Sequence, residues 1–159
     1  MKKYVIIYLY KTIKEKITMI LTDASYDKET GVSKCTILHN GVKYYGEARL
    51  HPDDKDNWSS FLGCRIAEAR ATLKALKTEK KEKQQELHYY ENFVKTLLSY
   101  NGVNLESKEY KIIKRIIWKK NKELQSLNGL IKYYEEEIKL LPVKREIVIR
   151  AIARRNEQK

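Results

Sequence analysis

The chain has few of the residues that interrupt or cross-link a fold. Its 159 residues include only two cysteines, two prolines and six glycines. Two cysteines are too few for a disulfide framework, so both are expected to be reduced, as in a cytosolic protein. The scarcity of glycine and proline favours long uninterrupted helices. No run approaches the roughly 18 apolar residues that a membrane span requires. Secreted, disulfide-stapled, zinc-finger and integral-membrane proteins are therefore not expected.

Positive charge is in excess. There are 33 Lys and Arg against 21 Asp and Glu, which gives a net charge of +12. Residues 61–159 hold 23 basic and 13 acidic residues, so the excess lies in the C-terminal part. Such an excess predicts an anionic partner there. The alternative is that the lysines at 77–83 and 119–122 form an ordinary solvated helix surface.

The first eighteen residues have two interpretations. Residues 4–10 are rich in β-branched and aromatic side chains, which predicts an extra edge strand. Alternatively, Lys14-Glu15 can be encoded by AAGGAG, a bacterial ribosome-binding sequence, so that translation starts at Met19 and residues 1–18 are an overhang of the assigned reading frame. A secretion signal is not expected, because no small-residue cleavage site follows the short apolar core.

Residues 19–56 predict a three-stranded antiparallel β-meander. The first strand shows alternating apolar residues, and a turn is expected at 27–31. Strands at 32–39 and 42–49 flank Asn40-Gly41, the dipeptide typical of a type I′ hairpin turn. Three residues before the following helix are suitable N-caps: Asn57, Ser59 and Ser60.

Residues 57–159 predict a helical hairpin that forms one continuous domain with the sheet. Apolar residues recur at alternating spacings of three and four along both expected helices. If the chain folds back at a turn over 99–104, Leu76 of the first helix lies near Ile131 of the second. Three lysines interrupt the apolar seams, which predicts loose packing midway: Lys80, Lys83 and Lys120.

The only internal proline of this helical part is Pro142. It is expected to end the second helix, so that residues 143–155 form a short third helix. The predicted fold class is therefore α+β, with a small antiparallel sheet, a long antiparallel helical hairpin and a short C-terminal helix.

Support for catalysis is weak. Asp23 on the first strand and Glu68 on the first helix resemble the opening of the ribonuclease H fold, whose members bind metal with such carboxylates. That fold needs a further Asp on a later strand, whereas long helices follow here. The alternative makes Asp23 a turn former and Glu68 a partner of Arg65 or Lys74. No histidine pair has metal-ligand spacing. An enzyme, a bound metal and a cofactor are not expected.

Arginines replace lysines near the C-terminus. Arg150 and Arg154 are four residues apart, hence on one helix face, and Arg145 lies more than a turn before them. The planar guanidinium binds phosphate with two hydrogen bonds, so these three residues are candidate ligand contacts. The alternative is salt bridges with Glu146 and Glu157.

Aromatic residues cluster where the sheet is expected to meet the first helix. Trp58, Phe61, Tyr44 and Tyr45 offer a shelf for a purine if the C-terminal helix packs back on them. The alternative is that these side chains belong to an ordinary core.

The small antiparallel sheet, the two long helices and the pair Arg150 and Arg154 together resemble the phage Thoeris anti-defence protein 1 family. Members are sponges that hold cyclised ADP-ribose isomers, and in some cases cyclic oligonucleotides, without cleaving them. They assemble as dimers or higher oligomers such as hexamers. The resemblance covers most of residues 19–159, and the long hairpin departs from the family. It implies a phosphate-gripping role for the arginine pair, a homo-oligomer, no membrane, and the cytoplasm of the infected bacterial host.

Four functions therefore compete. A sponge for a cyclic nucleotide immune signal is the leading prediction. A nucleic-acid-binding protein that uses the basic hairpin predicts binding that weakens steeply with salt. A ribonuclease H-like enzyme requires metal-dependent cleavage that depends on Asp23. A structural coiled-coil module binds none of these ligands.

Overall fold

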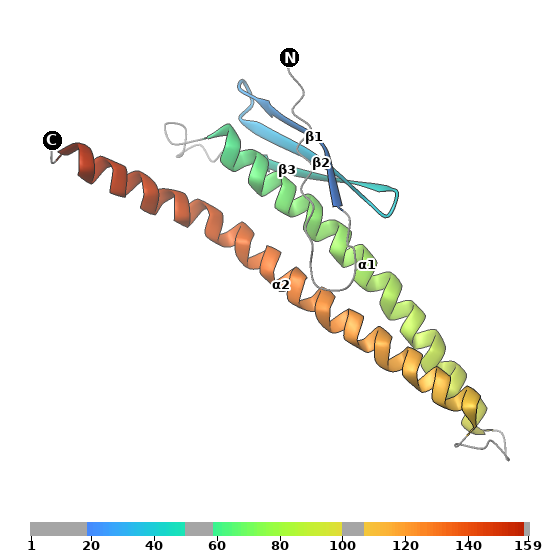
Figure 1. The fold of residues 1–159 in the computed structure, drawn as a ribbon. Coiled ribbons are helices and arrows are strands. Elements are labelled where there is room, and N and C mark those ends of the chain that lie inside the picture. Colours follow the sequence, from blue (N-terminus) through green and yellow to red (C-terminus); the bar gives the residue numbers. More distant parts are fainter. Residues whose placement is uncertain (1–18, 50–58, 100–106, 158–159) are drawn as a thin grey trace. The chain divides into compact units, whose positions relative to one another are not determined.

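The computed structural model describes residues 19–49, 59–99 and 107–157, and only the backbone of residues 144–145 and 147–157. The element order is β1 (Met19–Asp27), β2 (Val32–His39), β3 (Val42–Arg49), α1 (Ser60–Ser99) and α2 (Lys108–Glu157) (Figure 1). The fold is α+β, with a sheet before two long helices, as the sequence predicts. The predictions for residues 1–18 lie outside the described residues.

The three strands form an antiparallel sheet in the order β1, β2, β3. Asn40 and Gly41 have φ angles of 50° and 78°, both positive as a type I′ turn requires, so this hairpin prediction is confirmed. The carboxylate of Asp27 closes the other turn. Its Oδ1 accepts from the N–H of Glu29 at 2.9 Å, and its Oδ2 accepts from the hydroxyl of Thr30 at 2.7 Å. Both turns therefore follow from local sequence.

A bulge interrupts β1 between Leu21 and Asp23. The intervening Thr22 donates its hydroxyl hydrogen to the carbonyl oxygen of Thr36 at 3.1 Å. A bulge on an edge strand increases its twist and hinders pairing with another sheet. Asp23 is exposed within this strand, so the interpretation of Asp23 as a turn former is wrong.

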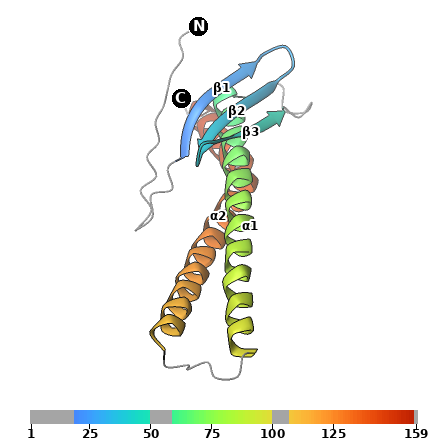
Figure 2. The ribbon, with the colours of Figure 1, turned by 90° about the vertical axis from the view of Figure 1, so that its right-hand side faces the viewer.

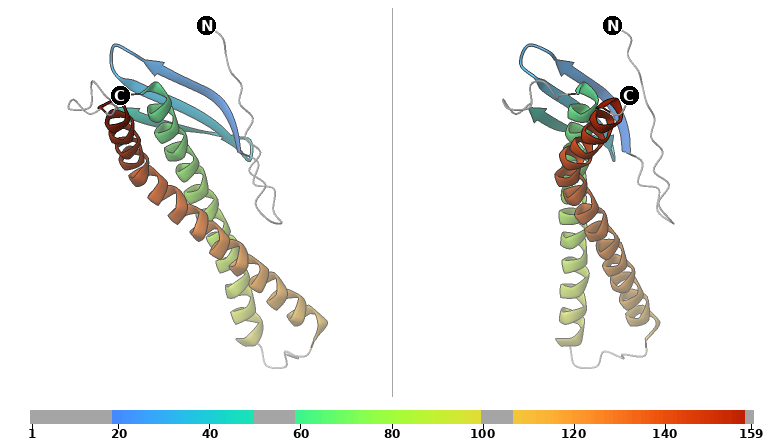
Figure 3. Two further views of the ribbon diagram at one scale, coloured as in Figure 1. Left: turned by 60° about the vertical axis from the view of Figure 1, so that its left-hand side comes forward. Right: turned by 90° about the vertical axis from the view of Figure 1, so that its left-hand side faces the viewer.

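The N-terminal half of α1 covers one face of the sheet (Figure 2). It does so with a row of alanines. Ala67, Ala71 and Ala75 recur every four residues and are fully buried. On β3, a Cβ added at Gly46 would lie only 1.8 Å from the carbonyl oxygen of Ala67. The helix backbone approaches the strand this closely because the side chains between them are small or absent. Figure 3 shows the same helix and sheet from two further sides.

Two cations of α1 bond to the open edge of β3. Arg70 donates to the carbonyl oxygen of Glu47 at 2.6 Å, and Lys74 donates to that of Tyr45 at 2.7 Å. Unpaired carbonyls on an edge strand can recruit a foreign strand, so these bonds protect the edge. They also show that α1 runs antiparallel to β3.

The chain forms two compact units, and each contains part of both helices. The first comprises Met1–Ala75 and Tyr133–Lys159, and the second comprises Leu76–Lys132. In the first unit, Arg65 of α1 forms ion pairs with Glu68 at 2.9 Å and with Glu137 of α2 at 3.3 Å. The predicted partnership of Glu68 with Arg65 is thus confirmed.

The second unit contains the seam between the two helices. Leu76 and Ile131, predicted neighbours, are both buried. Lys83 of α1 pairs with Glu123 of α2 at 2.8 Å, and Lys120 of α2 bonds to Glu86 of α1. These pairs lie within one residue of the predicted register. The seam lysines Lys83 and Lys120 therefore form ion pairs across the two helices.

Pro142 lies inside α2, which continues to Glu157. The predicted end of the helix at this proline is wrong, and the separate short helix over 143–155 is not confirmed. Proline has no N–H, so the carbonyl of Ile138 loses its partner in the helix. Leu141, the residue immediately before the proline, packs against the core of the first unit and holds this turn of α2 in place.

Candidate functional site

The start of α1 presents an exposed aromatic ring. The N–H of Leu62 donates to the hydroxyl oxygen of Ser59 at 3.0 Å, so Ser59 is the N-cap among the three candidates. Phe61 follows in the first turn and is 75% exposed. A ring this exposed is no part of the core and offers an apolar face to a ligand. Trp58 lies outside the described residues.

Tyr44 occupies a different place. It lies on the inner face of β3, packed against the core, with its ring centroid 6.5 Å from that of His39. Because α1 runs antiparallel to β3, Tyr44 lies beside the part of α1 near Lys74. That part is about 20 Å along the helix from Phe61 at 1.5 Å per residue. The structure therefore does not bring Tyr44 and Phe61 into one aromatic shelf. Tyr45, on the opposite face of the strand, is 61% exposed.

The three predicted ligand arginines all belong to α2. Arg150 and Arg154 are separated by about one turn along a continuous helix, which places them on one face. Arg145 precedes Arg150 by five residues, about 140° around the helix, so its register position is on another side. The side chains of all three lie outside the described residues. Salt bridges to Glu146 and Glu157 stay open as the alternative for the arginine pair.

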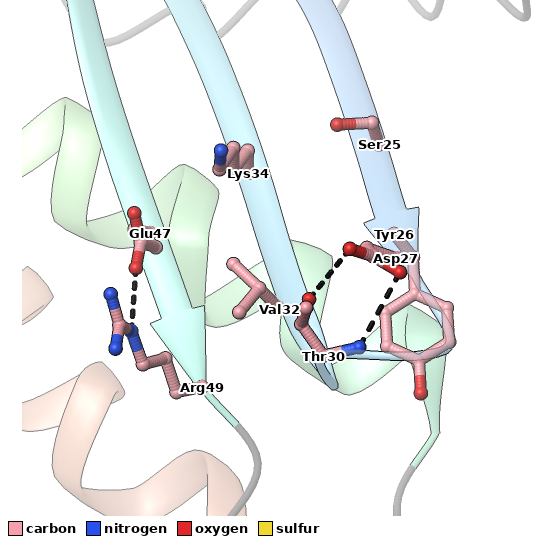
Figure 4. A pocket seen from close by; sticks show the side chains of 8 residues that line it. All are labelled: Ser25, Tyr26, Asp27, Thr30, Val32, Lys34, Glu47 and Arg49. Carbon is pink, nitrogen blue, oxygen red and sulfur yellow. Dashed lines mark hydrogen bonds and ion pairs between the residues drawn. The ribbon is translucent and has the colours of Figure 1, made fainter.

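The outer face of the sheet contains a hollow of about 460 Å³ (Figure 4). It lies on the side away from α1, at the turn between β1 and β2. Its lining residues are Ser25, Tyr26, Asp27, Thr30, Val32, Lys34, Glu47 and Arg49. The sequence contains no motif that predicts this hollow. The signal for it was the hairpin register, which sets Lys34 opposite Glu47.

Charges balance within this hollow. Arg49 bonds to Glu47 at 2.8 Å, and this bond holds the pKa of Glu47 below its usual range. The hydroxyl of Thr30 bonds to Asp27 and likewise lowers the pKa of that carboxyl. With Lys34, two cations face two anions. No net positive charge is available for a phosphate, so this hollow is a poor anion site.

The described residues show no converging set of three metal-ligating side chains. Asp23 is exposed on the sheet, and Glu68 is bonded to Arg65. A two-metal nuclease site needs several carboxylates directed at one point. In this part of the chain, Asp23 and Glu68 therefore lack the third carboxylate that such chemistry requires.

The two thiols are unsuited to nucleophilic chemistry. Burial raises the pKa of Cys35 to about 12, and it also raises the pKa of Cys64. The sulfur of Cys64 lies 3.9 Å from the carbonyl oxygen of Ser25. Since the thiolate is the reactive form, both cysteines are expected to be structural.

Neither α1 nor α2, within the residues described, has an apolar stretch suited to crossing a bilayer. Comparisons with protein-family models, with curated proteins and with solved structures found no match.

Proposed function

We propose that the chain sequesters a phosphate-bearing cyclic nucleotide, such as a cyclised ADP-ribose isomer, without cleaving it. The observation that supports this most directly is the continuity of α2 through Pro142 to Glu157. A continuous helix sets Arg150 and Arg154 about 6 Å apart along its axis, on one face. That spacing suits two guanidinium groups that bind neighbouring phosphates of one ligand.

Phe61 is the second contact in this proposal. Its exposed ring gives a nucleobase an apolar surface, and it belongs to the same compact unit as the C-terminal part of α2. Trp58, three residues earlier, stays a candidate for the same role. Tyr44 packs against the core of the sheet and is not proposed to touch the ligand.

Arg145 has a different role in the proposal. By its position in the helix, Arg145 lies on another side of α2 from the arginine pair. It therefore adds long-range electrostatic attraction for an anion and makes no direct contact with the same phosphates. The predicted homo-oligomer, a dimer or hexamer, remains part of the proposal, as does the cytoplasm of an infected bacterial host. Its role there would be that of a phage anti-defence protein.

Isothermal titration of the full chain with cyclised ADP-ribose isomers and cyclic dinucleotides tests the proposal. The double variant Arg150→Ala/Arg154→Ala is expected to lose at least about a hundredfold in affinity, because it removes two charge-assisted phosphate contacts. The matched control is Lys43→Ala/Lys139→Ala, which removes two exposed cations of the same unit and is expected to bind like the parent. Equal binding by both double variants would contradict the assignment of the arginines.

A further inference from the structure

The first part of α2 has a basic face that is continuous and free of acidic residues. We define the basic stripe as the exposed residues Lys108, Lys111, Lys114, Arg115, Trp118 and Lys122. At 100° per residue they fall within about 120° of the helix circumference and span roughly 21 Å. The acidic residues of this stretch, Glu109 and Glu123, fall more than about 100° from the centre of the stripe. The face therefore carries five cations and one aromatic residue, all in the second unit.

The aromatic residue is what distinguishes the stripe from a solvated lysine surface. Trp118 is 65% exposed, and the ammonium of Lys122 lies 5.8 Å from the centroid of its ring. The ammonium of Lys114 lies 4.8 Å from the ring of Tyr110. Charged side chains alone are enough to keep a helix surface soluble. An exposed indole between cations adds a flat surface on which a nucleobase can stack.

The charge of the stripe limits what can cover it. A second copy of the chain that docked by a twofold axis would place five cations against five cations, which is repulsive. An anionic bilayer favours a broad apolar face beside the cations, and the stripe has a single aromatic residue. A polyanion with regularly spaced phosphates and unpaired bases matches both the cations and the indole.

We propose that the basic stripe binds single-stranded nucleic acid, with the phosphates along its cations and one base stacked on Trp118. The binding is independent of sequence, since every base has a face that can stack. It uses residues of the second unit, whereas the proposed cyclic nucleotide site lies in the first. The two activities can therefore be separated by mutation.

Fluorescence anisotropy of a labelled oligothymidylate, titrated with the full chain at several salt concentrations, tests this. Five phosphate contacts predict a slope of about −3.5 for log affinity against log salt. Lys111→Gln/Lys114→Gln/Lys122→Gln is expected to reduce the slope to about −1.4, because three contacts are lost. The control Lys43→Gln/Lys81→Gln/Lys95→Gln removes the same charge from exposed positions outside the stripe and should keep the parent slope.

Two further variants isolate the stacking. Trp118→Ala should weaken binding roughly tenfold, whereas Trp118→Phe retains a ring and should lose much less. The triple variant of the stripe should still bind cyclised ADP-ribose like the parent. Equal effects of the stripe and control triples, or equal affinity for duplex and single strand with no effect of Trp118→Ala, would overturn the proposal. So would binding to phosphatidylserine vesicles without binding to the oligonucleotide.

Discussion

The contact between α1 and β3 at Gly46 predicts that a single added methyl group will disturb the sheet–helix core. In Gly46→Ala the new Cβ would meet the carbonyl oxygen of Ala67 at 1.8 Å and the amide nitrogen of Ala71 at 2.8 Å. Both obstacles are backbone atoms, so no side-chain rotation relieves them. The φ angle of Gly46 is outside the left-handed region, so the expected effect is steric and not conformational.

The size of the effect follows from the displacement required. Real Cβ contacts are not shorter than 3.0 Å, so α1 must move away by about 1.2 Å at this point. Such a shift loosens the packing of Ala67 and Ala71 along the strand. Overpacking a core costs about 1–3 kcal/mol, and a rigid obstacle favours the upper end, about 3 kcal/mol. For a chain of this length that corresponds to a decrease in Tm of roughly 6–12 °C.

Urea unfolding followed by circular dichroism measures this, and Gly129→Ala is the matched control. Gly129 is exposed on α2, and an added Cβ meets nothing within 4 Å. The same substitution there should raise the free energy of unfolding by about 0.5–1 kcal/mol, because alanine favours a helix over glycine. If Gly46→Ala proves as stable as Gly129→Ala, α1 does not approach β3 as described.

Three further predictions concern charge, thiols and capping. Burial raises the pKa of Glu123, but the hydrogen bond and charge of Lys83 and the nearby lysines outweigh this and lower it from 4.5. This carboxylate therefore stabilises the fold above pH about 4.5, and its contribution is lost as pH falls through its lower folded-state pKa. Glu123→Gln should cost about 1–2 kcal/mol in urea unfolding at pH 7 and progressively less in acid; a cost that does not change with pH would contradict the pairing. Cys35 and Cys64 should react slowly with a thiol reagent at pH 8 in the native state and rapidly in urea, and fast native labelling of Cys35 would refute its burial. Ser59→Ala should lower the free energy of unfolding by about 1 kcal/mol, and an unchanged value would show that Ser59 is not the cap.

The sequence predicts the parts of the fold that depend on local chemistry. Asn40-Gly41 fixes its turn because few other residues adopt positive φ at both positions, and this in turn fixes the bounds of β2 and β3. The heptad pattern also gives the hairpin register to within one residue. Neither prediction requires knowledge of distant contacts.

The sequence does not predict features that depend on tertiary packing. A proline usually ends a helix. Whether Pro142 does so depends on tertiary contacts such as the packing of the preceding Leu141 against the sheet–helix core. The sequence pattern does not single out the alanine row of α1, because the larger apolar residues beside it dominate the periodicity. Small residues become informative only when Gly46 is known to lie opposite them.

The candidate site shows the same division. The spacing of Arg150 and Arg154 places them on one face of any helix that contains both. The spacing of Phe61 and Tyr44 gives no such information, since one lies at a helix start and the other on a strand. Their separation follows only from the antiparallel direction of α1 against β3, which the bonds from Arg70 and Lys74 establish.

The central claim is that the chain holds a cyclic nucleotide intact. The most direct measurement incubates the purified chain with a cyclised ADP-ribose isomer, removes the free ligand, denatures the protein by heat and analyses the released nucleotide by chromatography. We expect the unaltered cyclic compound to be recovered in proportion to the protein, and to be lost in Arg150→Ala/Arg154→Ala. Recovery of a linear product, or of no nucleotide at all from the parent chain, would contradict it.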